Sequence, residues 1–205
     1  MALIHGFNFP TAIKFGSGAR RQLDEALWTA GIERPLIVTD TIVSGLSWFA
    51  ELGPLARGRA VATFDGAGGN PVVSQVEAGV AAYRAHQADG ILAVGGGAPM
   101  DVAKAIALLV SHPGHLFDYE DGKATRAIDT RSIPKIVAIP TTAGTGSEVG
   151  RSAVISDDET HAKKIIFDPG LLPVVVLADP VLTCQLPASV TAATGMDALT
   201  HLVEA

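Results

Sequence analysis

The stretch GILAVGGGAPMDVAKAIALLVSH, residues 90–112, contains the pattern that decides the fold. Its first part is an apolar run that ends in three glycines, at positions 95–97, and this predicts a buried strand. The apolar spacing of residues 100–112 predicts a helix, and Pro99 suits the first turn of that helix. A strand, a glycine turn and a helix in this order indicate the repeating unit of a parallel sheet.

The same alternation of strands and helices extends to both sides of this stretch. Further helices are expected at residues 19–31 and 70–86 and from residue 187 onward. Further strands are expected at residues 35–40, 60–66, 135–140 and 174–179, after an extended piece at residues 11–18, and residues 151–168 are expected to form two strands around an acidic turn. Because apolar runs such as LIV, ILAV, KIVAI and VVVLA are nearly continuous, the strands are expected to be buried on both faces. The predicted fold class is α/β, with a Rossmann-like, mostly parallel sheet and helices on both of its faces.

Composition and charge exclude several classes of protein. The 205-residue chain is 48% hydrophobic and 18% charged, which indicates a globular protein with a substantial core. A net charge of −6 argues against nucleic acids and anionic membrane surfaces as partners. The single cysteine, Cys184, excludes an internal disulfide framework and is expected to pack as a small hydrophobe. With no signal-peptide pattern and no apolar run long enough to span a bilayer, we expect a cytoplasmic protein.

Four segments at strand ends, TD, GGG, TTAGTGSE and AD, are candidates for a ligand site, because ligands of such sheets bind at the carboxyl ends of the strands. The glycines at positions 95–97 precede a helix N-terminus, which offers N–H groups to a pyrophosphate. The segment IPTTAGTGSEV, residues 139–149, supplies hydroxyl groups and backbone amides suited to phosphate or ribose. Asp40 ends a strand, where an acid can bind the adenosine ribose and repel a 2′-phosphate, which favours NAD over NADP. The alternatives are helix caps at Asp40 and Asp101, and hydroxyls that bond their own backbone.

A candidate metal pair lies near the end of the sequence. In GMDALTHLVEA, residues 195–205, Asp197 precedes His201 by four positions, so a helix would place both side chains on one face. The alternative is an acid in the first turn of a helix and a histidine that faces water or forms a salt bridge. The remaining histidines are expected to be solvated or without partners: His5, His86, His112, His115 and His161.

Several motifs, taken in order, resemble those of the iron-containing alcohol dehydrogenase family. They are FGSG, GGGAPMDVAKA, IPTTAGTGSEV, KKIIFDP, ADP and TGMDALTHLVEA, and the resemblance runs over about residues 9–205. The family has an N-terminal nucleotide-binding domain, related to that of dehydroquinate synthase, and an all-helical C-terminal domain, with the active site between them. The resemblance therefore implies a nucleotide-binding domain over residues 1–185 and the beginning of the helical domain over residues 186–205.

The resemblance also implies roles for individual residues. Asp40 would contact the adenosine ribose, Leu182 would lie near the adenine, and Ser152 would face the substrate. Ala98 stands where many members have serine, so its backbone N–H would remain while one hydroxyl contact is lost. The pyrophosphate side would be lined by Asn70, Gly96, Gly97, Ala98 and Asp101. The rest of the cofactor would be held by Thr141, Thr142, Thr145, Ser147 and Lys163.

By the same resemblance, Asp197 and His201 would be two protein ligands of a divalent catalytic metal, iron or zinc. The metal would lower the pKa of a bound primary or secondary alcohol, and NAD would accept the hydride, so the expected substrates are small alcohols and aldehydes. The family completes the metal shell with two further histidines from the helical domain, and no other histidine of this sequence matches them. We therefore expect an N-terminal portion that binds nucleotide but turns over little alcohol, assembled as a homo-oligomer.

Two other functions remain open. A stand-alone or inactive nucleotide-binding module would need no metal, so metal content distinguishes it from the enzyme. A polyol dehydrogenase or an NAD-using cyclase would share the fold, and substrate profiling distinguishes these activities from that of an alcohol dehydrogenase. The motif TGMDALTHLVEA favours the alcohol dehydrogenase.

Overall fold

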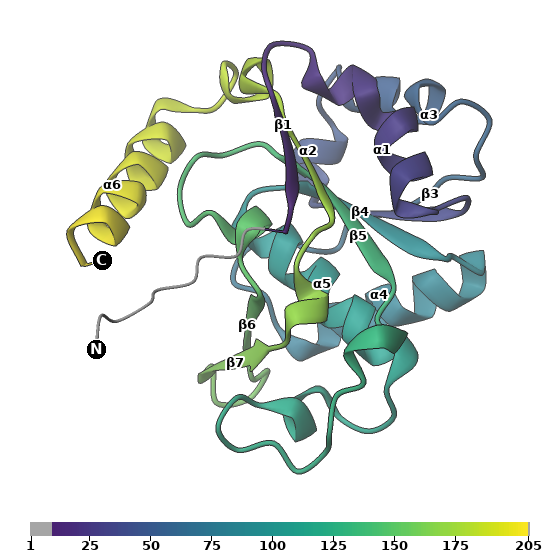
Figure 1. The fold of residues 1–205 in the computed structure, drawn as a ribbon. Helices are drawn as coiled ribbons and strands as arrows, with labels where there is room; N and C mark the ends of the chain where they lie inside the picture. Colours follow the sequence, from purple (N-terminus) through teal and green to yellow (C-terminus); the bar gives the residue numbers. More distant parts are fainter. Residues whose placement is uncertain (1–9, 205) are drawn as a thin grey trace, which may run out of the picture.

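The computed structural model describes residues 10–204 as an α/β fold built on a six-stranded sheet. The strands lie in the order β1-β8-β5-β4-β2-β3, and every neighbouring pair is parallel (Figure 1). The strands of this sheet are β1 (Ala12–Phe15), β2 (Pro35–Val38), β3 (Ala62–Phe64), β4 (Gly90–Gly95), β5 (Lys135–Pro140) and β8 (Val175–Ala178). A separate antiparallel hairpin pairs β6 (Ser152–Ser156) with β7 (Lys163–Phe167). These elements confirm the predicted Rossmann-like, mostly parallel sheet.

Helices connect the strands and cover the sheet. The α-helices are α1 (Leu23–Ala30), α2 (Thr41–Ser44), α3 (Leu52–Leu55), α4 (Val73–His86), α5 (Gly97–Ser111) and α6 (Ala188–Glu204). Short 3-10 helices lie in the connections: η1 (Ala19–Gln22), η2 (Phe49–Glu51), η3 (Leu116–Tyr119), η4 (Thr130–Ser132), η5 (Ser147–Val149), η6 (Pro169–Leu171) and η7 (Pro180–Thr183).

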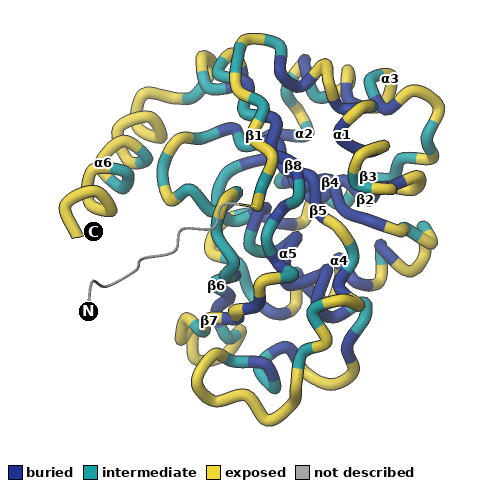
Figure 2. The backbone as a smooth tube through the Cα atoms, in the orientation of Figure 1, coloured by how far each residue is buried: buried dark blue, intermediate teal, exposed yellow. Residues whose placement is uncertain are grey.

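Different helices cover the two faces of the sheet, because alternate residues of a strand point to opposite faces. In β2, Leu36 and Val38 belong to the core that includes α4 and α5. Ile37, between them, belongs to the core that includes α1. All residues of β2 and β4 are buried, as the dark blue centre of Figure 2 shows. This two-sided burial explains the nearly continuous apolar runs in the sequence.

The neighbouring strands β2 and β4 mark the point at which the chain reverses its direction across the sheet. From β2 the chain moves outward to β3, and α4 then carries it back to β4 on the other side of β2. The connections that follow β2 and β4 therefore diverge and leave a crevice at the carboxyl ends of these strands. Because Asp40 follows β2 and the glycines at positions 95–97 end β4, the topology brings both segments to this crevice.

Some predicted local details are wrong. The helix α5 begins at Gly97 rather than at residue 100, with Pro99 still in its first turn. Cys184 is exposed instead of packed. His112 is buried instead of solvated, and its Nε2 accepts the backbone N–H of Asp129 at 2.8 Å. The sequence did not reveal this contact because Asp129 lies 17 residues further along the chain.

The last helix, α6, extends along one side of the molecule (Figure 1). No residue of α6 is buried, and Met196, Leu199 and Leu202 are exposed apolar side chains. The start of α6 at Ala188 agrees with the helical structure expected from residue 187, while the domain boundary at residue 185 stays a prediction. Within residues 10–204, no helix is long and apolar enough to cross a membrane.

Gly79→Ala is expected to destabilise the fold, although alanine normally stabilises a helix relative to glycine by up to about 1 kcal/mol. Gly79 lies in α4, where an added Cβ would overlap the Ile106 side chain of α5 and lie 3.2 Å from Phe64 Cε1. Urea denaturation should show a loss of about 1–3 kcal/mol in the free energy of unfolding. Gly195→Ala in the exposed α6 is the matched control, because its Cβ would meet no atom within 4 Å. Equal losses in the two variants would contradict this expectation.

Candidate active site

A pocket of about 510 Å³ opens at the carboxyl ends of β2, β4 and β5. This size is within the range of small-molecule and cofactor sites. The polar part of the lining comprises a carboxylate, hydroxyl groups and glycine backbone: Asp40, Gly68, Gly69, Gly96, Thr141 and Thr142. The apolar part comprises Ile42, Val43, Leu186, Pro187 and Val190. A lining with both polar and apolar residues suits a ligand with both phosphate or sugar groups and an aromatic ring.

Asp40 is both a helix cap and part of the pocket wall. Its Oδ1 accepts the backbone N–H groups of Ile42 and Val43, each at 2.9 Å, and this fixes the carboxylate at the start of α2. Its Oδ2 lies on the side of the glycine turn, where a Cβ on Gly95 would be 3.6 Å away. The cap and the ligand contact were alternatives in the sequence, but the geometry allows one side chain to serve both purposes.

The glycine turn between β4 and α5 forms the floor of the pocket. Gly95 has φ +142°, and a Cβ there would lie 2.7 Å from Pro99 Cγ, so this position requires glycine. Gly96 is the N-cap residue of α5 and supplies no capping side chain, so the N–H groups of the first turn remain available to a ligand. Ala98, in the same turn, adds a backbone N–H and no hydroxyl. A helix N-terminus with this surface is suited to a pyrophosphate.

The hydroxyl-rich loop, residues 141–150, packs directly against the glycine turn. The N–H of Thr141 donates to Gly95 O at 3.0 Å. A Cβ on Gly96 would lie 3.3 Å from Thr142 Oγ1, and one on Gly97 would lie 3.5 Å from Thr145 Oγ1. Because Gly96 and Gly97 have no side chains, the hydroxyl groups of Thr142 and Thr145 lie close to the N-terminus of α5.

Asp101 and Ser147 have contacts that the sequence did not predict. Ser147 Oγ donates to Asp101 Oδ1 at 2.7 Å, and Val154 N donates to Asp101 Oδ2 at 3.2 Å. Asp101 is inside α5, whose N-cap is Gly96, so the interpretation of Asp101 as the cap is wrong. Burial raises the pKa of Asp101, although Lys104 and the hydrogen bond from Ser147 oppose the shift. These two side chains are directed to each other, and a direct role of either in cofactor binding stays a prediction.

Asn70 and Lys163, which were assigned to the cofactor, are exposed and do not line the pocket. Asn70 is exposed and follows Gly69, which lines the pocket. Lys163 is exposed at the start of β7, opposite Ser156, whose N–H donates to Pro71 O at 2.7 Å.

Leu182 was expected near the adenine and Ser152 near the substrate, and neither residue lines the pocket. Leu182 is 3% exposed and packs in the core beside β8, so its side chain is turned away from solvent. Ser152 begins β6, and its carbonyl oxygen accepts a hydrogen bond from Lys104 Nζ at 2.8 Å. Both roles stay predictions.

The candidate metal pair lies on α6, as the spacing predicted. Asp197 Oδ1 and His201 Nε2 are 3.8 Å apart, and the side chains are 43% and 58% exposed. A Cβ on Gly144 would lie 3.2 Å from Asp197 Oδ2, so the pair is next to the hydroxyl-rich loop. Among residues 10–204 no group of three or more His, Cys, Asp or Glu residues could hold a metal. A carboxylate and an imidazole suit iron or zinc, but the two together form an incomplete site.

Lys104 was not singled out in the sequence, and Asp179 was noted only in the strand end AD and the motif ADP. Lys104 is 1% exposed and bonds to Ser147 and Ser152, and its position three residues after Asp101 was the available signal. Asp179 follows β8, and its carboxylate accepts Gly18 N at 3.0 Å and Arg20 Nη1 at 2.7 Å. Although burial opposes the shift, the hydrogen bonds from Arg20, Gly18 and Val181 lower the pKa of Asp179. Asp179 thus connects the FGSG segment to the end of the sheet.

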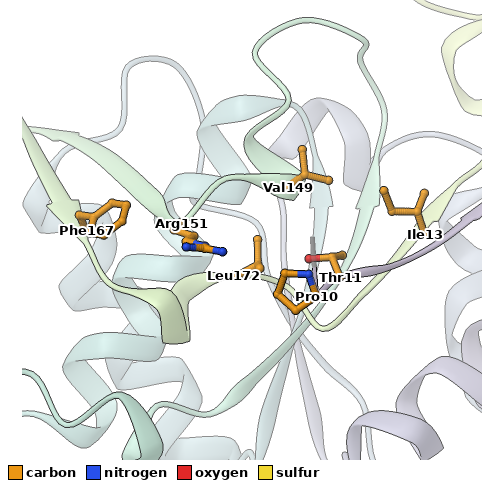
Figure 3. Close-up of a pocket in the computed structure, with 7 residues that line it drawn as sticks. All are labelled: Pro10, Thr11, Ile13, Val149, Arg151, Phe167 and Leu172. Atoms are coloured by element: carbon orange, nitrogen blue, oxygen red, sulfur yellow. The ribbon is translucent and has the colours of Figure 1, made fainter. Parts of the chain in front are cut away.

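A second cavity, of about 330 Å³, lies between the start of β1 and the end of β7 (Figure 3). Its lining is mostly apolar, with Ile13, Val149, Phe167 and Leu172, and it includes Arg151. No glycine turn and no helix N-terminus contributes to this lining, so it lacks the features that suit a pyrophosphate. The pocket beside Asp40 is therefore the better candidate for a nucleotide.

Comparisons with known proteins agree with this arrangement. The family model described as iron-containing alcohol dehydrogenase matches residues 10–180. Choline dehydrogenase of Bacillus subtilis (strain 168) is 38% identical, and the match covers 100% of this chain and 51% of that protein. For 4-hydroxybutyrate dehydrogenase of Cupriavidus necator the identity is 40%, with coverage of 100% and 52%.

A solved structure gives the same result for the fold. Sulfoacetaldehyde reductase from Bifidobacterium kashiwanohense in complex with NAD⁺ is 30% identical, with a TM-score of 0.90, and the match covers 99% of this chain and 53% of that one. The chain spans about half the length of each of these relatives. Because the family model matches most of the sequence, this chain belongs to the iron-containing alcohol dehydrogenase family.

Proposed function

We propose that this protein contributes the nucleotide-binding part of an NAD-dependent, metal-dependent alcohol dehydrogenase. The observation that carries the proposal is the pocket at the reversal point of the sheet. There, the Asp40 carboxylate and the uncapped N-terminus of α5 both line the pocket. A dinucleotide needs both features, one for its ribose and one for its pyrophosphate.

The pocket residues fit a dinucleotide by their chemistry. Asp40 would accept hydrogen bonds from the adenosine ribose and repel a 2′-phosphate, so NAD is the proposed cofactor rather than NADP. The first-turn N–H groups of α5 would hold the pyrophosphate, and the hydroxyls of Thr142 and Thr145 lie next to them. The apolar lining residues Leu186 and Val190 would exclude water from the adenine.

Asp197 and His201 would hold the divalent metal, iron or zinc, beside the hydroxyl-rich loop. When bound, the metal supplies Lewis acidity and the nicotinamide supplies a hydride acceptor. The protein's part is to orient the cofactor through the glycine turn and the loop of residues 141–150. The proposed substrates are small alcohols and the corresponding aldehydes, which is supported by the names of the choline and 4-hydroxybutyrate dehydrogenases among the relatives. A homo-oligomer stays a prediction that sedimentation can measure.

Titration of the protein with NADH and with NADPH, followed by nucleotide fluorescence, tests the proposed cofactor site. We expect saturable binding of NADH that is tighter than that of NADPH, because the Asp40 carboxylate repels a 2′-phosphate. If neither nucleotide shows saturable binding, the proposed cofactor site is wrong. If NADPH binds more tightly, the role assigned to Asp40 is wrong.

His201→Ala is expected to weaken the binding of Zn²⁺ or Fe²⁺ by roughly tenfold or more, because a lost ligand bond exceeds about 1.4 kcal/mol. Competition with a chromogenic chelator measures the affinity. His161→Asn is a matched control, since His161 is exposed and lies in the β6–β7 turn, with φ 55°, which asparagine tolerates. Equal metal affinities of the two variants would show that the pair on α6 is not the metal site.

A further inference from the structure

Lys104 is a buried cation that has no place among the proposed cofactor contacts. Its side chain is 1% exposed, and a buried charge is costly unless it is hydrogen-bonded. The Nζ atom donates to Ser147 O at 2.7 Å, to Ser147 Oγ at 2.8 Å and to Ser152 O at 2.8 Å. An ammonium group has three N–H donors, so these three acceptors satisfy it completely.

The acceptors lie at the two ends of the connection that leaves the hydroxyl-rich loop. Ser147 begins η5, near the end of the loop, and Ser152 begins β6. Asp101, one turn before Lys104 on the same face of α5, accepts Ser147 Oγ at 2.7 Å and Val154 N at 3.2 Å. Helix α5 therefore has two contacts with the site. Its N-terminal residues Gly96 and Pro99 line the pocket, and Lys104 and Asp101 bond to the end of the hydroxyl-rich loop.

We propose that Lys104 is a positioning residue, whose Nζ group holds Ser147 and Ser152 on α5 and so sets the cofactor-binding shape of residues 141–150. The proposal rests on the proposed function of the pocket. Without the Nζ group, Ser147 O and Ser152 O lose their donor, and the Asp101 carboxylate loses the basic group 3.9 Å away. The loop would then move away from α5 more often, and Thr142 and Thr145 would leave their places beside the glycine turn.

The titration of Lys104 provides a signature that simple packing would lack, because the neutral amine keeps two N–H donors for Ser147 O and Ser152 O and is less costly to bury than the ammonium. Burial lowers the pKa of Lys104 to about 8, although Asp101 of α5 and Glu148 of η5 oppose the shift. β6 contributes only backbone groups to this contact. Ser152 O accepts from Lys104 Nζ, and Val154 N donates to Asp101 Oδ2. When the loop opens, Lys104 becomes hydrated and its pKa returns toward 10.5, so the open state binds more protons above pH 8. The equilibrium constant for loop opening therefore falls as the pH rises, by about tenfold between pH 7 and pH 9.

Amide hydrogen exchange of the full chain, compared with Lys104→Met and with Lys164→Met as control, tests the proposal. Lys164 lies over the Phe117 ring at 4.0 Å, and its Nζ is 3.9 Å from Glu120 Oε2. At pH 7, Lys104→Met should reduce protection of residues 145–154 by at least about tenfold, leave α4 unchanged and weaken NADH binding about tenfold. In the wild-type protein, protection of the same residues should rise about tenfold from pH 7 to pH 9 after correction for intrinsic exchange.

Three results would overturn the proposal. One is a Lys104→Met variant whose loop protection and NADH affinity stay within twofold of wild type. Another is a loss of protection spread over the whole sheet, which would show general structural support. The last is a wild-type protein in which the exchange protection of residues 145–154 does not change between pH 7 and pH 9. This measurement tests the proposal even if Lys104→Met fails to fold. Failure of the wild-type protein to bind NADH would instead reject the proposed cofactor site, while the exchange data still test the contact of Lys104 with the loop.

Discussion

Asp40→Asn is expected to shift the nucleotide preference of the protein from NADH toward NADPH by about 10- to 100-fold, equivalent to about 1.4–2.7 kcal/mol. The substitution removes the negative charge that would repel a 2′-phosphate and one acceptor for the ribose hydroxyls. An asparagine Oδ1 can still accept the N–H groups of Ile42 and Val43, so the cap of α2 should survive. The ratio of the two dissociation constants, from fluorescence titrations, measures the shift.

Asp40→Ala separates the two roles of this side chain. It removes both the charge and the cap, so it should lower the free energy of unfolding by about 1 kcal/mol, whereas Asp40→Asn should change it by less than about 0.5 kcal/mol. An unchanged nucleotide preference in both variants would mean that Asp40 is only a helix cap, and the structural assignment of the ribose end of the pocket would then be wrong.

Gly96→Val is expected to reduce NADH affinity by at least about 100-fold, or about 2.7 kcal/mol, while the protein stays folded. Gly96 has φ −84° and ψ −159°, so it is outside the left-handed region that favours glycine. Its Cβ would lie 3.3 Å from Thr142 Oγ1, and the methyl groups would occupy the surface on which a pyrophosphate would meet the first turn of α5. Fluorescence titration gives the affinity, and thermal unfolding reports the fold.

Gly195→Val is the matched control for the added volume, because a Cβ on Gly195 would meet no atom within 4 Å. Gly195 lies in the exposed helix α6 and does not line the pocket, so this variant should bind NADH as the wild-type protein does. Wild-type affinity in Gly96→Val would show that the cofactor does not approach α5 at its N-terminus.

Much of the fold could be predicted because its signals are local. The run ILAV followed by glycines defined β4 and its turn, and KIVAIP matches β5 residue for residue. The start of α5 was placed too late because Gly97 and Ala98 read as part of a turn, while in the fold they form the first helical turn before Pro99. His112 was misread because its partner, Asp129, comes from a distant loop.

The sequence by itself determined the parallel sheet, the residues at the strand ends and the spacing of Asp197 and His201, because apolar periodicity and helical repeat are properties of short segments. Only the tertiary structure decided which strand ends meet. The order of β2 beside β4 places Asp40 by the glycine turn, and packing of β6 on α5 brings Ser147 and Ser152 to Lys104 across 43 and 48 residues. Such contacts depend on burial in a shared core, where a buried ammonium must find its acceptors, and no local pattern specifies those partners.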